Sequence, residues 1–275
     1  MKKLFISILI ILMAVGVNAQ DRDIQRALKD LAKAKELVAK KGNKAESWLK
    51  LADAYRNCYE APINGLAIGT PKMQANLILK DQVPAIKMID IAGQQFTVEE
   101  YQNKVIYYDA TETIRAIKVV KPVLSDEDAL EKAKEYYIKA KEMNISAKDL
   151  KQSVQYLRND YWDMGMTGNT LSIYEDAAKG FEECYRASIL MGELDKDALY
   201  YATIMSTLAK QSDKSIELAN ECLKNGYEDG NLYAMLAENY KAKGNLDKAK
   251  EYLEAGFAKF PTSQEILVSL INTYL

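Results

Sequence analysis

The chain has 275 residues, of which 37 are basic and 39 acidic, and its 48% hydrophobic content is enough for one or two domains with a large core. It contains no histidine, so Ser-His-Asp and Cys-His hydrolysis and histidine-ligated metal sites are excluded. Charges of both signs alternate along the helical segments, without the basic stripe typical of nucleic-acid binders, so we expect no nucleic-acid partner.

The N-terminus has the pattern of an export signal. A lysine pair precedes an almost unbroken apolar run from Leu4 to Val17, and the small residues Val17 and Ala19 suit a signal peptidase. We therefore predict a signal peptide over 1–19 and a periplasmic or outer-membrane-associated protein without a transmembrane anchor. The alternative is an uncleaved anchor, but the run is about 14 residues, shorter than the roughly 18 that a spanning helix needs. No cysteine follows the run, so we do not expect a lipoprotein.

Residues 20–58 are expected to hold two helices. The segment from Ile24 to Ala39 is amphipathic and rich in alanine and lysine, and we predict that it caps the N-terminal end of the fold. In the second helix an apolar face follows the i, i+3, i+4, i+7 spacing, with Trp48, Leu51, Ala52 and Tyr55.

Residues 59–124 have a different composition and are predicted to be an insertion. They hold four of the chain's 5 prolines. Two β-branched and aromatic runs, 105–108 and 114–120, are joined by 109–113 and indicate a β-hairpin, to which 87–91 could add a third strand. Residues 61–82 are predicted to be a loop with one short helix.

The helix that would complete a pair with the Trp48 helix follows only after this insertion. It is predicted over 126–142, where Ala133, Tyr137 and Ala140 form an apolar face and Ser125 and Asp128 form a capping pair. The insertion therefore splits one helix pair, and we predict that the two helices still pack directly.

The C-terminal part, 125–275, is dominated by an internal repeat. In residues 230–263 one helical face is followed by a Gly-Asn break, a second helix with small residues and a proline that ends it, at Tyr233, Leu236, Ala237, Tyr240, Ala249, Leu253, Gly256 and Pro261. Weaker copies occupy 196–229 and 158–191, where Gly168 leaves the end of the first helix undefined. Residues 264–275 supply a first helix only, so we expect either a truncated repeat or one whose apolar residues cap the previous pair directly.

This pattern resembles the 34-residue tetratricopeptide repeat. The resemblance implies a mainly α fold, a right-handed array of antiparallel helix pairs with a small β-hairpin insertion in the first pair. The layout, including Lys121-Pro122-Val123 after the strands, also resembles exported repeat proteins of Bacteroidetes-type bacteria. Together, the two resemblances imply a non-catalytic scaffold or adaptor in the cell envelope that needs no cofactor and binds a protein or peptide partner. The alternative is a glycan- or nutrient-binding accessory protein of an outer-membrane uptake system, against which the missing lipid-anchor cysteine argues.

In this family the first helices line a concave groove. The resemblance places Trp162, Met166, Tyr200, Ile204, Thr207, Glu238 and Lys241 in that groove, together with Asn159, Asp197, Leu208, Asn231 and Ala234. The lysine and asparagine of the carboxylate-clamp subset are missing, so we expect an aromatic and apolar groove. The competing interpretation is that these residues pack against neighbouring helices. The three cysteines, Cys58, Cys184 and Cys222, fit no metal motif and are predicted to be packed thiols.

Overall fold

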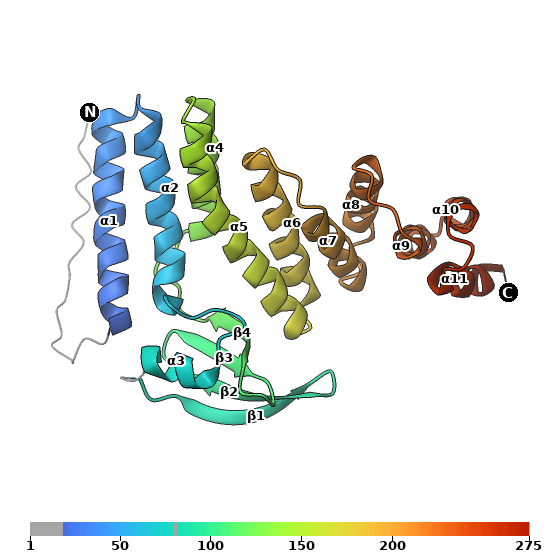
Figure 1. Cartoon of the computed structure of the whole chain (residues 1–275), viewed down its shortest axis with the longest axis horizontal. Helices are drawn as coiled ribbons and strands as arrows, with labels where there is room; N and C mark the ends of the chain where they lie inside the picture. Colours follow the sequence, from blue (N-terminus) through green and yellow to red (C-terminus); the bar gives the residue numbers. More distant parts are fainter. Residues whose placement is uncertain (1–18, 80–81, 275) are drawn as a thin grey trace.

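The structure is a computed structural model that describes residues 19–79 and 82–274. Its helices other than α3 follow one another in a row from α1 to α11, and a small sheet lies beside α2 and α5 (Figure 1). The predicted leader lies, except for Ala19, outside the described residues. The helices of the row are α1 (Ala19–Lys41), α2 (Ala45–Glu60), α4 (Ala129–Glu142), α5 (Ala147–Thr170), α6 (Tyr174–Leu190), α7 (Lys196–Leu208), α8 (Ser212–Lys224), α9 (Gly230–Ala242), α10 (Leu246–Lys259) and α11 (Gln264–Tyr274).

The predicted period of the repeat is present in the helices. The first helices α7, α9 and α11 begin at Lys196, Gly230 and Gln264, each 34 residues after the one before. Each first helix packs against the second helix that follows it, α7 against α8 and α9 against α10. The mainly α array of helix pairs predicted from the sequence is therefore confirmed. Among the described residues, no helix is both long and apolar enough to span a bilayer.

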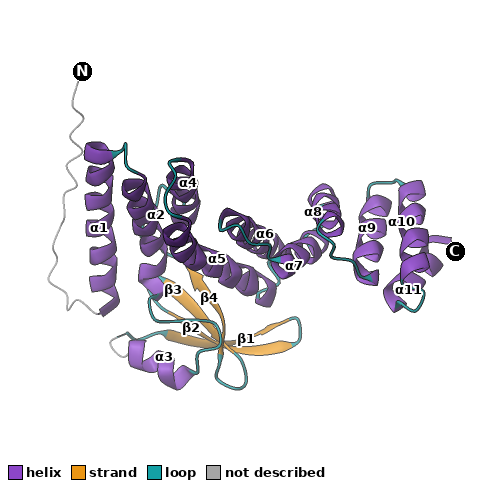
Figure 2. Ribbon diagram, turned by 45° about the horizontal axis from the view of Figure 1, so that its top comes forward, coloured by secondary structure: helices purple, strands orange, loops and turns teal. Residues whose placement is uncertain are grey.

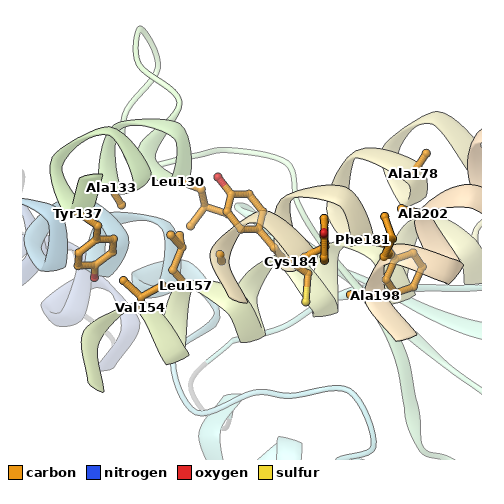
Figure 3. Packing of buried hydrophobic residues seen from close by; sticks show 14 of the residues in the cluster. Leu130, Ala133, Tyr137, Val154, Leu157, Ala178, Phe181, Cys184, Ala198 and Ala202 are labelled. Carbon is orange, nitrogen blue, oxygen red and sulfur yellow. The ribbon is translucent and has the colours of Figure 1, made fainter. Parts of the chain in front are cut away.

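The pair split by the insertion packs as predicted. Helix α2 lies against α4, and the ring of Tyr136 contacts those of Trp48 and Tyr55, with centroids 5.6 and 5.5 Å away. The hydroxyl of Tyr137, which is fully buried, donates a hydrogen bond of 2.7 Å to Asp53 of α2. One core cluster runs from α1 through this pair to α9, and Figure 3 shows the part of it between α4 and α7.

Two helix starts differ from the sequence-based expectation. Helix α4 begins at Ala129 rather than at 126, because Asp128 alone caps it, accepting hydrogen bonds from the backbone N–H groups of Leu130 and Glu131. Helix α5 begins at Ala147, ahead of the expected repeat start at 158, because Ser146 caps it by accepting from the N–H of Asp149. It also continues through Gly168 to Thr170, so the end left undefined by the sequence is regular helix.

The insertion is larger than the predicted hairpin. It forms a four-stranded antiparallel sheet in the order β1-β2-β3-β4, with a short helix on it (Figure 2). Strand β2 was not predicted from the sequence. The elements are the turn η1 (Ala61–Ile63), α3 (Lys72–Leu79), β1 (Ala85–Ile91), β2 (Gln94–Glu100), β3 (Lys104–Tyr108) and β4 (Ile114–Val119).

The sheet has its own small core and is attached to the array by one edge. Ala75 and Leu79 of α3 pack on Ile106, Tyr108 and Ile114. Strand β4 lies against α5, where the hydroxyl of Thr170 donates to the carbonyl oxygen of Arg115 (3.3 Å), and the Oγ1 of Thr167 accepts from the N–H of Ile117 (3.4 Å). The edge of the sheet that faces the helices is thus covered.

The three cysteines are free and buried, as predicted. Burial raises the pKa of Cys58 and Cys222 to about 11 and that of Cys184 to about 12. Because the thiolate is the reactive form, these side chains act as small apolar residues of the core.

Candidate binding surface

The residues predicted to line a groove lie on the first helices α5, α7 and α9, and the structure connects these helices side by side. The Nδ2 of Asn231 on α9 donates a hydrogen bond of 2.8 Å to the hydroxyl of Tyr200 on α7. The Nζ of Lys241 donates one of 2.8 Å to the backbone carbonyl of Asn272 on α11. We call the face formed by α5, α7 and α9 at these positions the first-helix face.

The aromatic residues of this face are partly used in packing. The ring of Trp162, which is half-buried, meets Phe181 of α6 edge-on at 5.2 Å and Tyr201 of α7 at 5.8 Å. The guanidinium of Arg158 lies 5.8 Å from the same ring and is ion-paired with Asp195. Trp162 is therefore held in place by α6 and α7, which leaves only part of its ring available to a partner.

Tyr200 is held in a similar way. Its ring stacks on Tyr227 with the centroids 4.6 Å apart, and burial raises the pKa of its hydroxyl above the ordinary value. The neighbouring Tyr201, which sequence reasoning did not select, is 41% exposed. The sequence signal that could have found Tyr201 is the Tyr200-Tyr201 pair, because adjacent residues of a helix face different directions and one of the two rings must point away from the packed side.

The hydroxyl of Thr207 is engaged inside the array. It lies 2.7 Å from the Oγ of Ser215 on α8 and accepts a hydrogen bond of 3.1 Å from Asn239 on α9. Asn239 is itself buried, and its amide also donates to the Oγ of Ser215 at 3.0 Å. This network fixes the spacing of α7, α8 and α9 and gives Thr207 a structural role.

The remaining predicted residues divide by exposure. Met166 and Ile204 are half-buried and pack against the main core cluster, whereas Glu238 and Lys241 are exposed. Leu208, at the end of α7, is 48% exposed although its side chain is apolar. The accessible part of the face thus combines charged side chains with a few apolar ones, above a floor of packed rings and hydrogen bonds.

No protein-family model matches the chain, and no curated protein matches it. Among solved structures, the crystal structure of the APC/C hetero-tetramer Cut9-Hcn1 is similar, with a TM-score of 0.37 and 12% sequence identity. The match covers 93% of this chain and 47% of that one, so the chain spans about half the length of that protein. The 34-residue period of α7, α9 and α11 and the packing of α7 on α8 and α9 on α10 define a helical-repeat protein built from helix pairs.

Proposed function

We propose that the protein is a non-catalytic interaction scaffold that binds a segment of a partner protein on its first-helix face. The observation that carries this proposal is the row of first helices joined by side-chain hydrogen bonds, from Tyr200 to Asn231 and from Lys241 to Asn272. Because these hydrogen bonds already order the first helices, little conformational entropy is lost there when a partner binds. The contacts that the exposed side chains make with the partner are then offset by a smaller entropic cost.

The chemistry of the face defines the partner segment. Glu238 and Lys241 are exposed beside each other on α9, one turn apart, and Leu208 supplies an apolar contact on α7. Such a surface suits a segment with both charges and at least one large apolar side chain. With the predicted leader, the proposal places this scaffold in the cell envelope.

The test uses two leucines of equal exposure. Leu208 on the first-helix face is 48% exposed, and Leu246 on the second helix α10 is 49% exposed. We expect Leu208→Arg to reduce recovery of partner proteins from an extract of the source organism by about tenfold. The control Leu246→Arg should leave recovery unchanged, with both variants folded by circular dichroism.

Two outcomes would contradict the proposal. Recovery that is equal for wild type and Leu208→Arg would move the binding surface away from the first helices. Specific binding to a glycan array, with no protein recovered above the Leu208→Arg background, would favour the accessory role in glycan or nutrient uptake.

A further inference from the structure

A cavity of about 430 Å³ lies where the insertion meets the array. It is bounded by the end of α2, the loop after η1, strand β4, the second half of α5 and the start of α6. Ile68, Ile117 and Met164 are among its apolar lining residues. Its volume is within the range of about 300–1,000 Å³ typical of ligand sites, which are mostly apolar with a few placed polar groups.

The charged groups of this junction cavity are mainly carboxylates, which come from three helices. Glu60 comes from α2, Asp160 and Asp163 from α5, and Asp176 from α6. Asp160 is buried and ion-paired with Arg56, whose Nε and Nη2 donate hydrogen bonds of 2.6 and 2.9 Å to it. The same guanidinium lies 3.8 Å from Glu60.

The other basic groups nearby leave two of these carboxylates uncompensated. Lys179 also lines the cavity, but its Nζ lies 3.6 Å from Asp128 and 3.9 Å from Glu131 of the array. Lys118, the remaining lysine of the lining, is exposed on β4. Within the described chain, neither Asp163 nor Asp176 has a basic group within ion-pair distance.

The raised pKa values of two carboxyls agree with this shortage of basic groups in the cavity. Partial desolvation by the surrounding protein raises the pKa of the Asp163 carboxyl to about 6, and the charge of Glu60 adds to this shift. Burial, followed by the charge of Glu60, also raises the pKa of Asp160 despite its pairing with Arg56. A positive charge entering the cavity would relieve this repulsion.

We propose that the junction cavity binds an organic cation on an apolar stem, either an alkylammonium or a guanidinium group. The cation would be held by Asp163 and Asp176, and the stem would lie against Ile117 and Met164. An organic cation is favoured over a metal ion because no group of three or more acidic, cysteine or histidine side chains in the described residues is arranged to hold a metal. This site is separate from the first-helix face, so either proposal can fail alone.

An organic cation of this kind could be a free polyamine or the lysine or arginine side chain of a bound protein, and calorimetric titration can distinguish these two sources. The first titration uses spermidine. The second uses an acetylated, amidated pentapeptide with a central lysine between two leucines. Glutarate and 1,5-pentanediol serve as anionic and neutral probes of similar stem length. We expect saturable binding of at least one cationic probe and none of the other two. Binding of spermidine assigns the site to free amines, and binding of the peptide alone assigns it to a side chain of a partner.

The variant Asp163→Asn/Asp176→Asn keeps the shape of both side chains and removes their charge. We expect it to weaken binding of the cation by at least about tenfold, since charge-assisted hydrogen bonds are lost. The matched control is Asp149→Asn/Asp247→Asn, which removes two exposed aspartates from the first turns of α5 and α10. It has the same net charge as the test variant and should bind like wild type.

A second variant keeps the proposal testable if the double substitution does not fold. Ala67 is exposed and lines the cavity, so Ala67→Trp should obstruct it without disturbing a core position. We expect the same loss of binding. Saturable binding that survives both Ala67→Trp and the loss of the two aspartates, or the absence of saturable binding by either cationic probe to wild type, would overturn the proposal.

Discussion

Gly180 of α6 faces Gly165 of α5 so closely that a Cβ atom on Gly180 would lie 2.7 Å from the Cα of Gly165. The atoms in the way belong to the backbone, so no side chain can turn aside to make room. The two helices can approach this closely only because both positions are glycine.

This contact predicts that Gly180→Ala destabilises the protein by about 1–3 kcal/mol, because α5 and α6 must separate to admit the methyl group. Helix propensity alone would act in the opposite direction by about 1 kcal/mol, since alanine is the better helix former. Urea denaturation of the two proteins measures the difference. A stability equal to or above that of wild type would show that the interface has more room than the structure gives it.

Ala249 provides a second test of tight packing, in the repeat with the strongest sequence pattern. It is buried on α10 in a cluster with Ala237 and Leu253. We predict that Ala249→Leu lowers the free energy of unfolding by about 1–3 kcal/mol through overpacking. Ala255 on the same helix is exposed, so Ala255→Leu should leave the thermal midpoint nearly unchanged. Equal midpoints for the two variants would mean that the assigned register is wrong.

Two buried tyrosines allow the hydrogen bond between α2 and α4 to be measured. The hydroxyl of Tyr137 donates to Asp53, whereas that of Tyr161 has no hydrogen-bond partner within the described chain. We predict that Tyr137→Phe costs about 1–2 kcal/mol, because it removes one hydrogen bond from a partly buried carboxylate. Tyr161→Phe should be neutral or stabilising, because it removes an unpaired buried hydroxyl. Chemical denaturation of both variants tests the contrast, which equal losses would contradict.

The raised pKa of Asp163 makes a prediction about pH. Its carboxyl ionises near pH 6 in the folded protein and near pH 4 when unfolded, so ionisation disfavours the fold. The cost is absent below about pH 4, grows as the pH rises, and is complete above about pH 6. Asp163→Asn should therefore raise the thermal midpoint at pH 7.5 and have no effect at pH 4.

Because Asp163 is exposed, the gain should stay below about 1 kcal/mol. The measurement needs amine-free phosphate and acetate buffers, so that no cation occupies the cavity. A midpoint shift of equal size at both pH values would contradict the assignment of the effect to this carboxyl.

The helices after residue 196 could be predicted because each repeat carries its own signal. Small residues at Ala237, Ala249 and Gly256 and the spacing of Tyr233 and Leu236 define helix faces locally. The structure places all of these residues in the core.

Strand β2 could not be predicted in the same way. Only Phe96 and Val98 mark it as apolar, and its buried Glu99 is polar. The hydroxyl of Tyr101 donates a hydrogen bond of 2.6 Å to Glu99, but the charge of this carboxylate is compensated by Lys72, which lies 2.9 Å away and 27 positions earlier in the chain. A local pattern cannot record that a buried charge has a distant partner.

The binding surfaces show the same limit. The repeat register predicts that Thr207 points towards the groove. In the structure its hydroxyl instead accepts a hydrogen bond from the side chain of Asn239 on the next first helix. The junction cavity has no sequence signature, because segments around residues 60, 117 and 163 meet only when the sheet docks on α5.

The place of the insertion has a mechanical consequence. Both of its ends connect to helices that pack directly on each other, α2 and α4, while its sheet touches the row through β4. A pulling force applied along the row would pass from α2 to α4 through their interface and bypass the strands. The sheet therefore lies outside the path of this force, and the spacing of α2 and α4 is set by their own interface rather than by the strands.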